Sequence, residues 1–139
     1  MIFHVFLATG VSWLVAQIIK VIFLTATYQR FSFTYFLFTG GVPSAHAAIV
    51  TALATSIYMV EGFSLLFVLA FFFAAVTIRD ATGVRLQSSK QAILINQLLK
   101  KEHINGSANE MVGHTVIQAF YGAVLGFCIS YIWFFIFVV

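Results

Sequence analysis

Long apolar runs separated by short polar stretches dominate this chain. Each of four runs is close to the ~20 residues that a helix needs to cross the hydrocarbon core of a bilayer. They cover about residues 5–27, 44–60, 63–78 and 114–139. The two middle runs are the shortest, and Glu61 and Gly62 between them fit a tight turn. The pattern therefore predicts four transmembrane helices in a single domain over residues 1–139.

A fifth stretch, about residues 84–102, has a different pattern. Apolar side chains such as Ala92, Ile95 and Leu99 recur at helical spacing, with polar side chains such as Asn96 between them. This spacing is typical of an amphipathic helix that lies along a membrane interface. The expected fold class is an all-α integral membrane protein with four transmembrane helices plus a cytoplasmic-side interfacial helix.

The composition supports a membrane protein. Hydrophobic residues make up 62% of the chain and charged residues only 8%, whereas soluble domains contain roughly 25% charged residues. No basic residue precedes Lys20, so the n-region of a signal peptide is missing and the first apolar run is expected to be retained. The single cysteine, Cys128, cannot form a disulfide within the chain.

The distribution of charge indicates an orientation and a partner. With four spans, all seven basic residues fall at the end opposite the termini, which the positive-inside rule places in the cytoplasm. If some cations serve an anion site, only Lys90, Lys100 and Lys101 remain as independent signals of orientation. The basic residues are interleaved with spans, which argues against nucleic acid and favours a lipid phosphate. We expect a bacterial plasma membrane, with the active site on its cytoplasmic face.

One polar stretch interrupts the apolar pattern most strongly. It reads Thr39-Gly40-Gly41-Val42-Pro43-Ser44-Ala45-His46. The glycines allow a tight turn, and Pro43 favours a helix start around residues 42–44. The free N–H groups of a helix start, together with the Ser44 hydroxyl, suit a phosphate. The alternative is that this stretch only ends a loop and that His46 caps or lines a packed interface.

Polar and ionisable side chains gather at one predicted membrane face. They are Lys20, Arg30, Ser44, His46, Asp80, Arg85, Glu110 and His114. Charges at a membrane edge are costly and tend to mark a functional cavity. Two histidines among several cations suit phosphoryl transfer, with one imidazole attacking phosphorus and the other protonating the leaving oxygen. Three alternatives remain: a metal held by both histidines with Asp80 or Glu110, a plain interfacial ion pair of Asp80 with Arg79 and Arg85, and Arg30 as a topology anchor.

Several motifs, in order along nearly the whole chain, carry a resemblance to a known family. They are the segment 40–47, then Asp80-Ala81-Thr82-Gly83-Val84-Arg85, then Gln91 to Asn96, then Gly113-His114-Thr115, and finally Gly122 to Gly126. Together they resemble the divergent branch of the type-2 phosphatidic acid phosphatase and vanadium haloperoxidase superfamily. The resemblance implies a helical phosphatase in which Ser44 and Lys20 bind phosphate, His46 is the acid and His114 is the nucleophile. We also expect Gly41 to help bind phosphate, and we expect no metal or cofactor.

Two positions depart from the pattern of the wider superfamily. Ala108 and Asn109 stand where an arginine is expected, so Arg85 or Arg30 would have to bind the phosphate instead. Gln118 stands where an acidic residue would orient the nucleophilic histidine. We therefore expect Gln118, Glu110 or Asp80 to orient His114.

The resemblance predicts hydrolysis of a lipid phosphomonoester such as phosphatidate or phosphatidylglycerophosphate through a phosphohistidine. The alternative is a catalytically impaired member that binds lipid headgroups or has a structural role in the membrane. Gly122 and Gly126, four residues apart, predict close helix packing and are also expected to allow a homo-oligomer through that face.

Overall fold

The computed structural model describes residues 1–36 and 40–138, and all the secondary structure in this part of the chain is helical. The helices are α1 (Ile2–Tyr28), the short 3-10 helix η1 (Phe33–Phe36), α2 (Ala45–Glu61), α3 (Leu65–Thr82), α4 (Val84–Lys101) and α5 (Val116–Phe137). Each α-helix lies within a few residues of an expected run. Thr39 of the polar stretch and Val139 at the end of the last run lie outside the described residues.

In the part of the chain that the structure describes, three helical segments are long and apolar enough to cross a membrane. They are α1, the combined α3 and α4 (Leu65–Lys101), and α5, whereas α2 is apolar but shorter. The outer faces of these segments expose large apolar side chains such as Ile22, Phe72 and Phe120. A surface of this kind is stable only in contact with lipid or another apolar partner.

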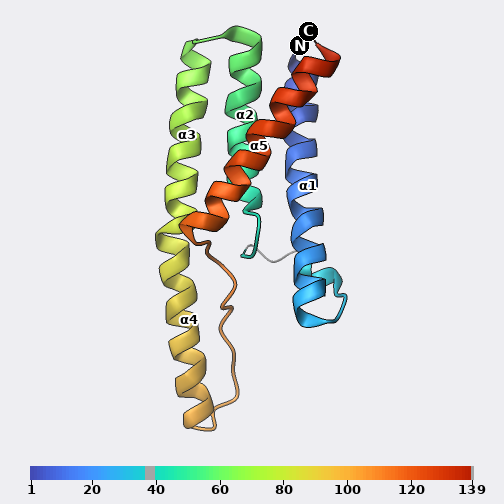
Figure 1. The fold of residues 1–139 in the computed structure, drawn as a ribbon. Coiled ribbons are helices and arrows are strands. Elements are labelled where there is room, and N and C mark those ends of the chain that lie inside the picture. Colours follow the sequence, from blue (N-terminus) through green and yellow to red (C-terminus); the bar gives the residue numbers. More distant parts are fainter. Residues whose placement is uncertain (37–39, 139) are drawn as a thin grey trace.

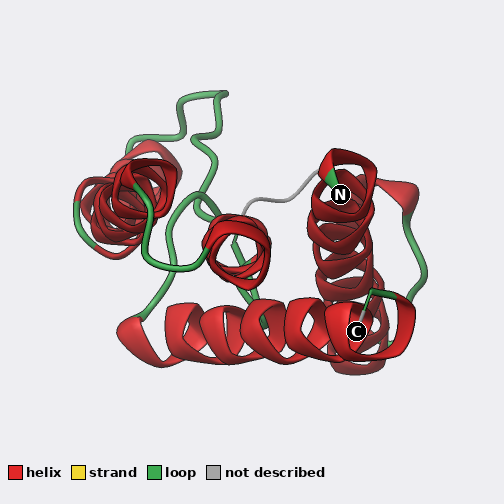
Figure 2. Ribbon diagram, turned by 90° about the horizontal axis from the view of Figure 1, so that it is seen from above, coloured by secondary structure: helices red, strands yellow, loops and turns green. Residues whose placement is uncertain are grey.

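The short helix α2 lies at the centre of the bundle, where it packs against α1, α3 and α5. Both termini and the turn between α2 and α3 lie at one end, and η1 and α4 lie toward the other (Figure 1). Viewed from above, α5 runs across the other helices (Figure 2). The polar residues expected to form a site are therefore near the end away from the termini.

The direction of α4 differs from the expected interfacial helix at residues 84–102. Figures 1 and 2 show α4 continuing nearly along the axis of α3, so it does not turn across the end of the bundle. At the junction, the N–H of Gly83 donates to the carbonyls of Arg79 and Asp80 at 2.8 and 3.3 Å. Because these bonds continue the helical pattern, the chain keeps its direction. Residues 102–115 then return alongside α4 to the bundle (Figure 1).

Gly122 and Gly126 account for the close crossing of α5 over α2. A Cβ at Gly122 would overlap the carbonyl oxygen of Ser44, and one at Gly126 would overlap that of Ala48. Both glycines are buried. The face that was expected to allow a homo-oligomer is thus occupied by α2 of the same chain, and its small residues serve packing within the bundle.

Candidate functional site

The site begins at the N-terminus of α2. Ser44 is the N-cap residue, and its hydroxyl accepts from the N–H of Ala47 at 3.3 Å. Its own N–H donates to the carbonyl of Gln118, at the start of α5. Ser44 is fully buried. The predicted helix start is therefore present, and Ser44 caps it, which leaves the other N–H groups of the first turn facing the site end of the helix.

His114 lies on the segment of residues 102–115, called here the return segment, just before the N-cap residue of α5. Its N–H donates to the carbonyl of Ala81 at 3.0 Å, which ties this residue to the end of α3. Its Nδ1 lies 3.1 Å from the carbonyl oxygen of Gly41. Since a carbonyl only accepts, Nδ1 carries the hydrogen in the neutral ring, and Nε2 keeps a free lone pair.

The Nε2 atom of His114 is the most informative atom of the site. The side chain of His114 is 1% exposed, and Nε2 has no hydrogen-bond partner among the described residues. Buried polar atoms almost always find a partner, so an exception calls for a functional explanation. A lone pair that is fixed in direction and unoccupied suits a nucleophile or a ligand-binding atom.

Two further side chains flank this imidazole. The rings of His46 and His114 lie 6.4 Å apart between centroids, inclined by 60°. The charge of Lys20, a residue of α1 that is 1% exposed, acts on both histidines. Gly41 has φ +98°, and a Cβ there would lie 3.3 Å from Cγ of Lys20. Gly41 therefore combines a left-handed backbone, a close approach to Lys20 and the carbonyl that holds His114.

The junction between α3 and α4 supplies a charged pair at the border of the site. Nε of Arg85 donates to Oδ2 of Asp80 at 2.6 Å, and both side chains are 39% exposed. The ion pair that was considered as an alternative role for Asp80 is therefore present with Arg85. Both charges also act on His46, so the pair belongs to the surroundings of the two histidines.

His114 is neutral at physiological pH. Burial, followed by the positive charges of Lys20 and His46, lowers the pKa of His114 from 6.5 to about 4, against the opposing effects of the Gly41 carbonyl and the Gln118 side chain. The unprotonated form that a nucleophile requires is therefore the resting form.

Three residues expected at the site have other surroundings. Glu110 is exposed, and its carboxylate accepts from the Asn96 side chain at 2.7 Å. Arg30 is exposed in the turn after α1, and it is not among the charges found to act on either histidine. The Gln118 side-chain oxygen accepts from the N–H of Thr115 in a capping box. The Gly41 carbonyl accepts the Nδ1 hydrogen, for which Gln118 or Glu110 was the expected acceptor, and the Gln118 side chain still acts on His114 by raising its pKa.

Sequence reasoning missed the residues that hold the return segment. The hydroxyl of Ser89 accepts from the N–H groups of Val112 and Gly113 at 3.1 and 2.9 Å. The side chain of Asn96 exchanges two hydrogen bonds with the backbone of Ala108. Asn96 was part of the Gln91 to Asn96 motif that carried the family resemblance, so the sequence drew attention to it. Nothing in the sequence distinguished Ser89 from its neighbour Ser88.

Gly113 completes this attachment of the return segment. A Cβ at Gly113 would overlap the backbone of Leu86, so the segment can lie directly against the first turn of α4 only with glycine here. A cavity of about 370 Å³ opens beside the attachment, lined among others by Gly41, Gly113, Gln118, Lys90 and Glu110.

The assembled group can bind and transfer an anionic phosphoryl group. It offers an unpartnered imidazole nitrogen, a second imidazole, a buried ammonium group and a helix N-terminus within one region. Within residues 1–36 and 40–138, no group of three or more His, Cys, Asp or Glu side chains is arranged to hold a metal ion.

Comparisons with known proteins identify the family of this chain. Residues 3–129 match the family described as the divergent PAP2 family. The uncharacterized membrane protein YuiD of Bacillus subtilis (strain 168) is 32% identical over 132 residues, which cover 83% of this chain and 84% of that protein. No solved structure matches the chain. Together with the apolar helices, these matches identify an integral membrane protein.

Proposed function

Since this chain belongs to the divergent PAP2 family, we propose that it is a membrane phosphatase that hydrolyses a lipid phosphomonoester of the phosphatidate or phosphatidylglycerophosphate type. The observation that carries the proposal is the buried Nε2 of His114, which has no partner and whose direction the Gly41 carbonyl fixes. A lone pair prepared in this way is the requirement for covalent catalysis on phosphorus.

In the first step, Nε2 of His114 attacks the phosphorus atom and the bond from phosphorus to the lipid oxygen breaks. Protonated His46 donates its proton to the departing oxygen, so the lipid leaves as an alcohol and the phosphoryl group remains on His114. The Gly41 carbonyl holds the Nδ1 hydrogen and stabilises the charge that develops on the ring.

In the second step, water attacks the phosphohistidine. His46, now neutral, takes a proton from the water, the bond from phosphorus to Nε2 breaks, and inorganic phosphate leaves. Both histidines return to their starting protonation states, so one water molecule is consumed for each phosphate released.

Positive groups near the two histidines stabilise the charge on the phosphoryl oxygens. Lys20 supplies a buried ammonium group, and Arg85 supplies a guanidinium whose Nε donates to Asp80 and which has further N–H donors on its terminal nitrogens. The first turn of α2, capped by Ser44, adds N–H groups and the positive end of its dipole. Stabilisation of this kind is usually the largest contribution to phosphoryl transfer.

In this proposal α2 is the fourth crossing, although it is shorter than the others, and it begins at the site. We propose that the site faces the cytoplasm at a bacterial plasma membrane, and the basic residues at this end of the bundle support this orientation. Such a site would receive its substrate from the inner leaflet.

Phosphate release and phosphoenzyme trapping test the proposal. The purified protein, in detergent and with excess chelator, is given phosphatidate and phosphatidylglycerophosphate, and the acid-labile phosphate on the protein is measured after rapid quenching. Wild type should release phosphate from at least one lipid, and His114→Gln should neither release phosphate nor retain label.

An exposed histidine provides the matched control. His103 lies on the return segment with φ 53°, a backbone conformation that asparagine tolerates, so His103→Asn should keep wild-type turnover. Full turnover in a folded His114→Gln variant would refute the mechanism. Absence of phosphate release from any lipid phosphate by folded wild type would favour the alternative of a headgroup-binding or structural protein.

A further inference from the structure

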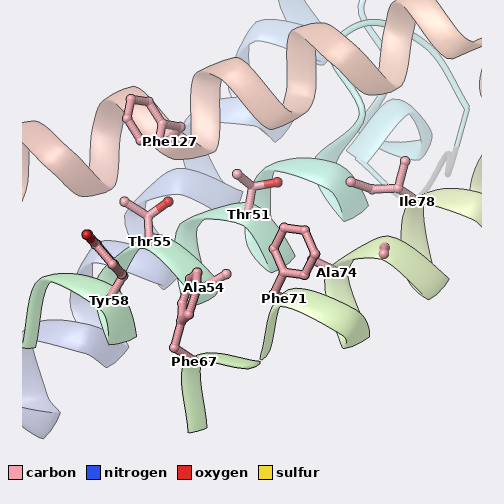
Figure 3. A pocket seen from close by; sticks show the side chains of 10 residues that line it. Thr51, Ala54, Thr55, Tyr58, Phe67, Phe71, Ala74, Ile78 and Phe127 are labelled. Atoms are coloured by element: carbon pink, nitrogen blue, oxygen red, sulfur yellow. The ribbon is translucent and has the colours of Figure 1, made fainter. Parts of the chain in front are cut away.

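A groove on the membrane-facing side of the bundle lies between α2, α3 and α5 (Figure 3). Its volume is about 500 Å³, within the usual range for sites that hold small ligands. Phe67 and Phe71 of α3 and Phe127 of α5 face it, together with Ala54, Thr55 and Tyr58 of α2. No residue that lines it carries a charge, so its surface suits a hydrocarbon chain.

The groove runs along the bundle from the level of the histidines toward the opposite end. On α3 it extends from Ile78, two residues before Asp80, to Phe67. At 1.5 Å per residue this separation is about 16 Å. One leaflet of a bilayer contributes about 15 Å of hydrocarbon, half of the ~30 Å core. On α2, the nearest lining residue is Thr51, five residues after His46.

We infer that this groove holds an acyl chain of the lipid whose phosphate reacts at His114, an inference that rests on the proposed function. Its near end adjoins the helix segments that carry His46 and Asp80, and its length matches a chain that extends from a headgroup to the middle of the bilayer. A lipid bound in this way keeps its phosphate at the depth of the site while its chain lies against α3.

The groove contributes orientation more than affinity. A chain that moves from the bilayer into the groove exchanges one apolar environment for another, so little hydrophobic free energy is gained. Blocking the groove should therefore lower the turnover of long-chain substrates through misplacement of the phosphate, by roughly ten- to a hundredfold for shifts of about 1 Å. A short-chain substrate that does not need the groove should be hydrolysed as before.

Two neighbouring residues of α3 offer a matched pair of variants. Ala75 is exposed and lines the groove, so Ala75→Trp fills it without disturbing the core. Val76, the next residue, is 68% exposed and does not line the groove, so Val76→Trp adds the same bulk to another face of the helix. Both proteins should fold, because both positions are exposed.

The direct experiment is photolabelling by a phosphonate analogue of phosphatidate with a diazirine near the end of one acyl chain. The protein cannot hydrolyse the phosphonate, so the result does not depend on turnover. Labelled peptides should contain Phe67 or Phe71, and excess phosphatidate should remove the label whereas diacylglycerol should not. Ala75→Trp should reduce this labelling about tenfold, as expected when an added side chain occupies the site, and Val76→Trp should not.

Turnover of dihexanoyl and dioleoyl phosphatidate by the same proteins separates the two proposals. Failure of wild type to hydrolyse either lipid would refute the phosphatase, whatever the labelling shows. Hydrolysis of both lipids with equal loss or no loss in Ala75→Trp would refute the role of the groove alone. Labelling that diacylglycerol removes equally well, or cross-links from the groove to a second copy of the chain, would also overturn the inference.

Discussion

Replacing Ser89 by alanine tests how the return segment is held in place. The Ser89 hydroxyl is the acceptor for the N–H groups of Val112 and Gly113, directly before His114. Two lost hydrogen bonds at about 1 kcal/mol each amount to about 2 kcal/mol of local stability. At 1.36 kcal/mol per factor of ten, local opening becomes about 30 times more frequent. Alanine is a strong helix former, so α4 itself should persist.

Hydrogen exchange followed by mass spectrometry measures this effect whether or not the protein is an enzyme. The amides of Val112 and Gly113 should exchange about 30 times faster in Ser89→Ala than in wild type, for the reason just given. Ser88→Ala is the control, because the Ser88 hydroxyl is exposed and contacts only the Val84 carbonyl of its own helix. Unchanged exchange of both amides in Ser89→Ala would show that Ser89 does not hold the segment. On a substrate, kcat should fall roughly tenfold or more through displacement of His114.

The other predictions concern packing, charge and proton binding. Gly126→Leu should abolish folding, because even a Cβ would overlap the Ala48 backbone, and size-exclusion chromatography with thermal unfolding would show it. Lys20→Met should keep the melting temperature, since a buried charge is replaced by an apolar side chain of similar length, and lower kcat by about 10²–10³ in the phosphate-release assay. Because the pKa of His114 is lowered from 6.5 to about 4, the unfolded chain binds a proton between these values and the folded chain does not. Wild type should therefore lose stability relative to His114→Gln as pH falls from 6.5 to 4 in chemical unfolding. Gln118→Glu should leave turnover within about twofold, because a glutamate can also complete the capping box at this position and the Gly41 carbonyl already accepts the Nδ1 hydrogen.

The helices followed closely from the hydrophobic pattern. The runs expected at 5–27 and 114–139 became Ile2–Tyr28 and Val116–Phe137, since a continuous apolar segment of this length has few stable alternatives in a membrane. The direction of α4 could not be predicted from the hydrophobic pattern. Whether a helix continues or turns at Gly83 depends on hydrogen bonds at a single junction, and an amphipathic pattern is compatible with either direction.

The role of Gly122 and Gly126 shows a second limit of prediction from the sequence. A Gly-x-x-x-Gly pattern states that another helix comes close, and it does not state whether that helix belongs to the same chain. Here the neighbour is α2, whose Ser44 and Ala48 carbonyls lie where Cβ atoms would be. The same contact holds the start of α2 against the start of α5. The glycine pattern therefore marked a contact that positions the site, although the sequence alone did not connect the two.

The orientation of His114 could not be predicted because a main-chain carbonyl provides it. Side-chain acceptors such as Gln118 and Glu110 are visible in a sequence, but the Gly41 carbonyl lies 73 residues away and every residue has a carbonyl. What singles out Gly41 is its φ of +98° and its contact with Lys20, and both require the fold. A carbonyl fixes the tautomer as well as a carboxylate does, but it carries only a partial charge, so it stabilises an imidazolium less. Burial is the main cause of the low pKa of His114, and the Gly41 carbonyl offsets it only in part. In the proposed mechanism, a nucleophile held in this way stays neutral over a wide pH range, and Lys20 and the N-terminus of α2 would stabilise the charge that develops during the reaction.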